Sequence, residues 1–144
     1  DFTKLIETCG AMVVADRYCF GSFPSREQIV IGAGESAFDA ICRHYLHWNQ
    51  CARFMDGMKI DQRHSEVKRL VDEYRADGFI YENMKFCEFW SYEKVLASHI
   101  FVNELHIPCC TIEKEYALGA VGQLRTRFQA FIESLEIKSI QGGK

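Results

Sequence analysis

Short apolar runs alternate along the chain with longer segments in which apolar residues recur every three or four positions. The short runs are rich in β-branched and aromatic residues and follow a glycine or a proline, which predicts strands. The predicted strands are residues 11–16, 78–82 and 109–113. The longer segments have the period of amphipathic helices. The predicted helices are residues 35–48, 65–78, 91–105 and 119–136, preceded by a first helix that ends at Gly10.

This order of elements predicts an α/β fold with a doubly wound parallel sheet, flavodoxin-like and three-layered. The length of 144 residues suits one domain. We expect this domain, residues 1–144, to be cut from a longer subunit, because the chain starts inside a helix and without Met. In such sheets ligands bind beyond the carboxyl ends of the strands. The residues at those positions are 17–21, 85–88 and 115–119, which include Cys19 and Cys87.

Composition and charge narrow the class of function. The net charge is −3 and the basic residues form no block, so no nucleic-acid partner is expected. No apolar run approaches the roughly 18 residues of a membrane span, and no signal peptide is present, so no membrane contact is expected. Seven cysteines, an odd number in a chain of this length, indicate reduced thiols and a cytoplasmic location.

A glycine motif precedes the helix predicted at residues 35–48. Gly32, Gly34 and Ala37 match the pattern G-x-G-x-x-A, which binds dinucleotides when it joins a strand to a helix. The run before the motif is short and begins with polar residues. No strand ending in an acidic residue follows about 20 residues later, and residues 53–64 are interpreted as a loop. The favoured interpretation is therefore a turn that caps the helix after it.

The cysteines and histidines do not form a standard metal motif. The chain has no C-x-x-C, and Cys109 and Cys110 fall inside a predicted strand, where they are interpreted as packing residues. His44 and His47 share a helix face without a third ligand at matching spacing. Cys87 differs, because polar residues flank it at the carboxyl end of a strand. A thiolate there could be one ligand of a cluster whose other ligands lie elsewhere. No catalytic residue is assigned.

Several short motifs follow one another in the second half of the chain. They are Lys85-Phe86-Cys87, Ile107-Pro108, Glu115-Tyr116, the run Gly122 to Arg127, Ala130-Phe131 and Glu133. In this order they resemble the C-terminal part of subunits of the benzoyl-CoA reductase and 2-hydroxyacyl-CoA dehydratase family. Residues 10–22 resemble the preceding strand and loop of the same family, so the resemblance covers nearly the whole chain.

The resemblance implies a mechanism and its partners. Such subunits hold a [4Fe–4S] cluster through three cysteine thiolates, of which Cys87 is one and two belong to the preceding domain. A homologous sibling subunit pairs with each, and an ATP-hydrolysing iron–sulfur protein supplies one electron at very low potential. The electron passes to a CoA thioester, where it either reduces an aromatic ring or expels a 2-hydroxyl group through a ketyl radical.

Three interpretations of the function stay open. The sequence of residues 113–127 resembles the benzoyl-CoA reductases more closely. After Cys87 the chain has Glu88-Phe89-Trp90, whereas dehydratase-like members often have Asp-Pro at this point, which also favours a reductase. A 2-hydroxyacyl-CoA dehydratase subunit is the alternative. A third interpretation, from another class, is a non-catalytic scaffold or docking domain in which Cys87 only packs. Under each, the 144-residue segment alone is expected to be inactive and to carry no stable cluster.

The start of the last predicted helix is a candidate substrate site. Gly119 and Gly122 would leave backbone N–H groups open at a helix N-terminus, which could attract a phosphate of CoA. Arg125 and Arg127 lie two residues apart and so point to different sides of this helix. This spacing argues against a shared anion clamp, and we expect at least one of the two arginines to make structural hydrogen bonds or an ion pair.

Overall fold

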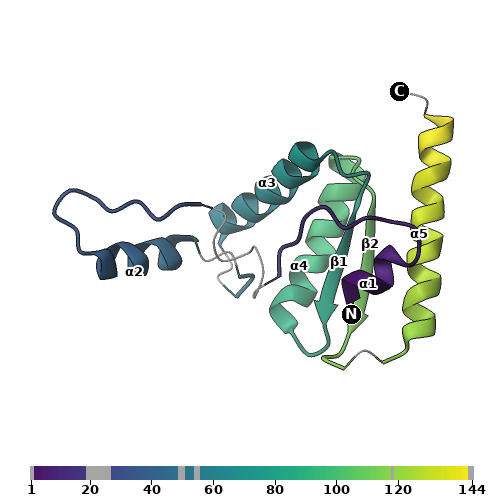
Figure 1. The fold of residues 1–144 in the computed structure, drawn as a ribbon, viewed down its shortest axis with the longest axis horizontal. Helices are drawn as coiled ribbons and strands as arrows, with labels where there is room; N and C mark the ends of the chain where they lie inside the picture. The colour runs from purple at the N-terminus through teal and green to yellow at the C-terminus, as the bar shows by residue number, and fades with distance from the viewer. Residues whose placement is uncertain (1, 19–26, 49–50, 54–55, 118, 143–144) are drawn as a thin grey trace.

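The computed structural model describes residues 2–18, 27–48, 51–53, 56–117 and 119–142. Helices and strands alternate in its second half, and the first half is helical with long connections (Figure 1). In chain order the elements are α1 (Phe2–Glu7), α2 (Ala37–Trp48), α3 (Gly57–Tyr74), β1 (Phe79–Met84), α4 (Glu88–His99), the π-helical turn η1 (Ile100–Glu104), β2 (Cys109–Lys114) and α5 (Val121–Gln141).

The two strands form a parallel pair at the centre of the molecule. Their register pairs Phe79 with Cys109 at one end and Met84 with Lys114 at the other. The strands predicted at residues 78–82 and 109–113 are therefore confirmed, as is their parallel direction. The crossover between them runs through α4 and η1, so this part of the chain is a β-α-β unit.

Helices pack on both faces of this pair, because successive strand residues point to opposite sides. Ile80 and Ile112 face a core built from α1 and α5, in which Phe128 is fully buried and packs edge-on against Phe2. Phe79 and Tyr81 on β1 face a second core with α3, α4 and η1. Figure 1 shows α1 and α5 on one side of the strands and α3 and α4 on the other.

The arrangement is compatible with the predicted α/β class. The described residues contain two strands, however, so the doubly wound, flavodoxin-like sheet stays a prediction. The strand predicted at residues 11–16 is wrong, since residues 11–18 have no regular secondary structure. Ala11 and Val13 do pack against the core with α1 and α5, as an alternating pattern requires. Periodicity fixed which side chains face inward, but it does not encode backbone pairing with a neighbouring strand.

Helix α3 is longer at its start than its apolar pattern predicts. Residues 53–64 were interpreted as a loop, but α3 begins at Gly57, and the side chain of Asp56 caps it by accepting a hydrogen bond from the Lys59 N–H at 2.8 Å. The loop prediction is therefore wrong from residue 57 onward. At the other end, Arg75 adopts a positive φ of 49° and closes the helix before the predicted limit of residue 78.

Helix α2 confirms the helix predicted at residues 35–48, but its apolar face is not covered. Phe38, Ile41 and Tyr45 are exposed, whereas Ala40 is buried. Figure 1 shows α2 standing away from the strands, to the left. Among the described helices, none is both long and apolar enough to cross a membrane.

Gly78 marks a close approach between two connections, and its replacement should be costly. A Cβ at this position would lie 2.9 Å from the carbonyl oxygen of Pro108 and 3.0 Å from Cζ of Phe131. We expect Gly78→Ala to lower the free energy of unfolding by about 1–3 kcal/mol, because backbone and ring must shift. Urea unfolding measures this, with Gly57→Ala as the control, since a Cβ at Gly57 meets no atom within 4 Å. Equal unfolding midpoints for the two variants would contradict the prediction.

Candidate functional site

The carboxyl ends of β1 and β2 open onto a depression of about 660 Å³, here called the Cys87 hollow. Two of the three segments predicted for this edge, after β1 and after β2, meet there. The third segment includes Cys19, which lies outside the described residues. The hollow is lined by Arg53, Met84, Lys85, Phe86, Cys87, Glu88, Phe89, Glu115, Tyr116 and Ala117.

A tight turn after β1 places Cys87 at the first turn of α4. The Cys87 N–H donates to the Met84 carbonyl oxygen at 3.1 Å, and the Lys85 N–H donates to the Lys114 carbonyl oxygen at 2.8 Å. Phe86 closes the turn with a positive φ of 67°, which is unfavourable for a bulky residue. Its ring is 96% exposed, as is that of Tyr116 after β2. Two large aromatic side chains thus flank the hollow without cover from the described residues.

Cys87 is half-buried and is the N-cap residue of α4. Its side chain makes no capping hydrogen bond, so the backbone N–H groups of the first turn of α4 are not satisfied by the thiol. The positive end of the helix dipole favours negative charge at this position. A cysteine that binds a metal does so as a thiolate, whose negative charge would suit this end of the helix.

The two strand ends are joined by an ion pair at the edge of the hollow. Lys85 Nζ lies 2.8 Å from Glu115 Oε1, and the hydrogen bond between them raises the pKa of Lys85 and lowers that of Glu115. Both side chains are exposed, so the pair contributes little to stability. The pair places one positive and one negative charge together at the edge of the hollow.

The two adjacent thiols of β2 lie away from Cys87. Cys109 and Cys110 lie at the start of β2, the end of the sheet opposite to the hollow. Burial, followed by the neighbouring thiol of Cys110, raises the pKa of Cys109 to about 12, and burial also raises the pKa of Cys110. These groups are protonated thiols at neutral pH, in line with the packing role predicted for them. Cys42 lies on α2, away from the strand ends.

Within the described residues, no group of three or more His, Cys, Asp or Glu side chains is placed to hold a metal ion. Cys87 fits the requirements for one ligand of a shared cluster, because it is half-buried, borders a hollow and lies at a helix N-terminus. The remaining thiolates of a cluster would have to come from residues that the structure does not describe or from outside this chain.

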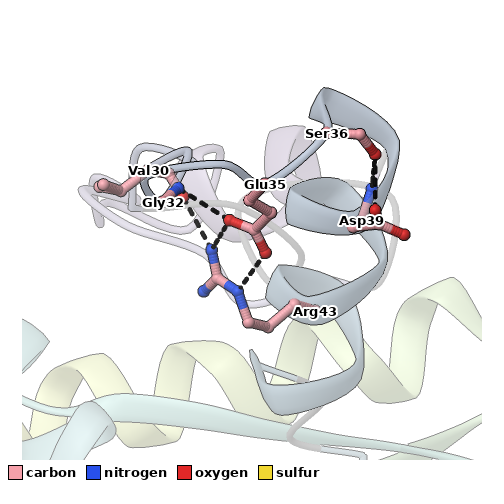
Figure 2. Close-up of polar contacts among 6 residues, drawn as sticks. All are labelled: Val30, Gly32, Glu35, Ser36, Asp39 and Arg43. Atoms are coloured by element: carbon pink, nitrogen blue, oxygen red, sulfur yellow. Dashed lines mark hydrogen bonds and ion pairs between the residues drawn. The ribbon is translucent and has the colours of Figure 1, made fainter.

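The glycine motif before α2 is a capping turn, as predicted (Figure 2). Gly34 has a positive φ of 78°, and the Gly32 N–H donates to Glu35 Oε2 at 2.8 Å. Arg43 holds the same carboxylate with two hydrogen bonds of 2.8 Å and also donates to the Val30 carbonyl oxygen. The hydrogen bonds from Arg43, and then from Gly32, lower the pKa of Glu35 to about 2.

The same turn ends in a helix cap. The Asp39 N–H donates to Ser36 Oγ at 3.1 Å, and Ser36 Oγ donates to Asp39 Oδ2 at 2.7 Å. Residues 27–32 before it form no strand, so the strand–loop–helix context of a dinucleotide site is missing.

A buried charged cluster between α3 and α4 was not predicted from the sequence. Arg63 donates to both carboxylate oxygens of Glu93 at 2.9 Å, and His64 Nε2 lies 3.2 Å from Glu93 Oε1. The side chains of Arg63 and Glu93 are each only 2% exposed. The loop interpretation of residues 53–64 hid two of the three members. Asp56 as an N-cap signal could have extended α3 back over them.

The fold and this site together define the class of protein: an α/β unit that presents a thiol at the carboxyl end of a parallel strand. The family model for the 2-hydroxyglutaryl-CoA dehydratase D-component matches residues 1–135, so the chain belongs to this family. The chain is also 32% identical, over 132 residues, to an Escherichia coli (strain K12) protein described as "Putative dehydratase subunit YjiM". This match covers 92% of the chain and 33% of that protein, so the chain spans about a third of its curated relative.

Proposed function

We propose that this chain is part of a 2-hydroxyacyl-CoA dehydratase subunit. The family match over residues 1–135 carries the proposal, and the relative from E. coli is likewise described as a dehydratase subunit. The sequence motifs favoured ring reduction of benzoyl-CoA, with dehydration as the alternative. The comparisons support the alternative, since both descriptions name a dehydratase and neither names a benzoyl-CoA reductase.

The reaction proposed is the removal of water from a 2-hydroxyacyl-CoA thioester. The C–O bond at carbon 2 and a C–H bond at carbon 3 break, a C=C bond forms, and water leaves, so the reaction consumes no net electrons. A [4Fe–4S] cluster would supply the transient low-potential electron that makes this elimination possible. The role of Cys87 is to provide one thiolate to that cluster from the turn after β1.

The hollow also suggests where other molecules approach. Phe86 and Tyr116 expose their rings beside Cys87. Burial of these rings under substrate or another chain would be favourable, and it would exclude water from the hollow. The proposed partners are a homologous sibling subunit, an ATP-hydrolysing iron–sulfur activator and the CoA thioester itself.

The N-terminus of α5 is the proposed contact for a phosphate of CoA. Ala120 is the N-cap residue there and makes no side-chain capping bond. A Cβ added at Gly119 or Gly122 would meet no atom within 4 Å, so the space beside both residues is open to a ligand. The Gly119 N–H is not open as predicted, because it donates to the Ala117 carbonyl oxygen at 2.8 Å. The proposed contact is therefore made by the backbone N–H groups of the first turn of α5, since N–H groups at a helix N-terminus bind phosphate well. Arg127 serves structure instead, because it donates to the Thr111 carbonyl oxygen of β2 at 2.7 Å.

Product analysis tests the proposed reaction. The intact subunit, assembled anaerobically with its partners, reductant and ATP, is incubated separately with a panel of 2-hydroxyacyl-CoA thioesters and with benzoyl-CoA. We expect loss of water from at least one 2-hydroxyacyl-CoA, detected as its enoyl-CoA by mass spectrometry, and no change in benzoyl-CoA. Gain of two hydrogens by benzoyl-CoA would establish a ring reductase instead. A colourless, iron-free subunit with intact thiols and no turnover would establish the scaffold function.

A further inference from the structure

A fully buried amide on β1 is connected to the backbone of Cys87. Asn83, the residue before the end of β1, is 0% exposed. Its Nδ2 donates to Ser91 Oγ at 3.0 Å, and Ser91 Oγ in turn donates to the Cys87 carbonyl oxygen at 2.9 Å. These two hydrogen bonds tie the end of β1 to the first turn of α4, across the turn that carries Cys87.

The backbone of Cys87 is thereby held at both of its polar atoms. Its carbonyl oxygen accepts from Ser91 twice, from Oγ and from the backbone N–H at 3.0 Å. Its N–H donates to the Met84 carbonyl oxygen. The side chain of Cys87 makes no capping bond of its own, so the thiol is free to bind a ligand while hydrogen bonds hold its backbone.

Packing alone does not explain why an asparagine is buried at position 83, because a buried amide lowers the stability of the fold. Its Oδ1 is buried and has no hydrogen-bond partner among the described residues. An unpaired buried carbonyl of this kind costs about 1–3 kcal/mol, and an apolar residue would avoid that cost. A serine that bonds back to the residue four positions earlier is common in helices and would by itself need no further explanation. The buried Asn83, which orients the Ser91 hydroxyl, does need an explanation beyond helix geometry.

We infer that Asn83 and Ser91 are positioning residues for Cys87, which hold its thiol in the direction required by a metal cluster. The inference rests on the proposed ligand role of Cys87. Removing a group that orients a metal ligand without contacting the metal typically weakens metal affinity by about 10–100-fold. Asn83 and Ser91 fill that role because they fix the Cys87 carbonyl without touching its sulfur.

Two substitutions test the inference in the intact, cluster-loaded subunit. Ser91→Ala removes the hydroxyl that joins Asn83 to Cys87, and Asn83→Leu removes the amide at similar volume. We expect each variant to release iron to a chelator about 10-fold faster or more, with an altered electron paramagnetic resonance spectrum of the reduced cluster. Ser91→Thr, which keeps a hydroxyl, should release iron at the wild-type rate and show the wild-type spectrum. Ser98→Ala on the same helix is the control, because the Ser98 hydroxyl is buried without a partner among the described residues.

A second measurement does not depend on the cluster. In the iron-free subunit, the rate at which iodoacetamide alkylates Cys87, followed by peptide mass spectrometry, should rise several-fold in Ser91→Ala and stay unchanged in Ser98→Ala. Wild-type iron release and wild-type alkylation in both Ser91→Ala and Asn83→Leu, with circular dichroism showing intact folds, would overturn the inference. If one variant does not fold, the other decides.

The outcomes also separate this inference from the proposed function. Unchanged iron content in Cys87→Ser together with faster alkylation in Ser91→Ala would refute the ligand role and keep Asn83 and Ser91 as groups that position Cys87. Lost iron in Cys87→Ser with no effect in the Ser91 and Asn83 variants would keep the ligand role and refute the positioning.

Discussion

Under the proposed function, replacing Cys87 with serine should deprive the intact subunit of most of its iron and lower the rate of dehydration more than about 100-fold. Loss of a group behind a metal ligand already costs 10–100-fold, so loss of the ligand itself should exceed that range. The fold should persist, because Cys87 is half-buried and its side chain makes no capping hydrogen bond. Iron and sulfide analysis after anaerobic preparation, together with the rate of enoyl-CoA formation, measures both effects.

Cys109→Ala is the matched control for this experiment. It also removes one half-buried thiol, but at the opposite end of the parallel strands, where the thiol is protonated at neutral pH. We expect it to cost about 1–2 kcal/mol of stability or less and to leave iron content unchanged. Full iron and wild-type turnover in Cys87→Ser would remove Cys87 from the proposed ligand set, and equal iron loss in both variants would point to general damage.

The sequence predicted β1 and β2 because each is a short apolar run directly after Gly78 or Pro108, and because the run between them is long enough for a helix. The same reasoning failed at residues 11–16. That run alternates correctly, with Ala11 and Val13 turned toward the core, but it makes no ladder with a neighbouring strand in the described structure. Side-chain periodicity reports burial, whereas strand formation also requires a partner at hydrogen-bonding distance.

The position of Cys87 at a strand end could be predicted, but its surroundings could not. Nothing in the apolar pattern indicates that Phe86 would adopt a positive φ, since bulky residues rarely do. The helix predicted to begin at residue 91 begins earlier, because α4 starts at Glu88 with Cys87 as its N-cap residue. The hydroxyl of Ser91 therefore lies inside the first turn, where it bonds to the Cys87 carbonyl oxygen instead of capping the helix.

The buried charged residues were the feature that the sequence patterns predicted least well. A polar segment such as residues 57–64 carries no sign of burial in its composition, so nothing local indicated that Arg63 would be buried. Its burial depends on Glu93, 30 residues later, which supplies the opposite charge. Long-range pairs of this kind follow from the packing of α3 against α4 and not from any local pattern.

Removing the carboxylate of Glu93 should destabilise the protein by about 3–5 kcal/mol. The guanidinium of Arg63 would remain charged and buried without its bidentate partner, and an unpaired buried charge is among the costliest defects in a core. Urea unfolding of Glu93→Ala measures the loss. Glu73→Ala is the control, because Glu73 pairs with Arg69 on the exposed side of α3 and should contribute about 0.5 kcal/mol or less.

A double substitution tests whether the charge, and not the volume, is responsible. Arg63→Met combined with Glu93→Met removes both charges and keeps the interior filled, so it should be more stable than Glu93→Ala alone. Equal destabilisation of the single and double variants would show that packing, and not charge pairing, accounts for the loss.

The pH dependence of the same pair provides an independent measurement. Burial alone would raise the pKa of Glu93, but the close approach of His64 and the hydrogen bonds from Arg63 outweigh it and bring the pKa from its ordinary value of 4.5 to about 2. A carboxyl group with a lowered pKa in the folded state stabilises the fold fully above 4.5, and this contribution is lost as pH falls toward 2. The stability difference between wild type and Glu93→Ala should therefore be largest at neutral pH and shrink steadily below about pH 4.5. A difference that stays constant from pH 7 to pH 3 would show that folding does not lower the pKa of Glu93, and that the acid sensitivity of the fold arises elsewhere.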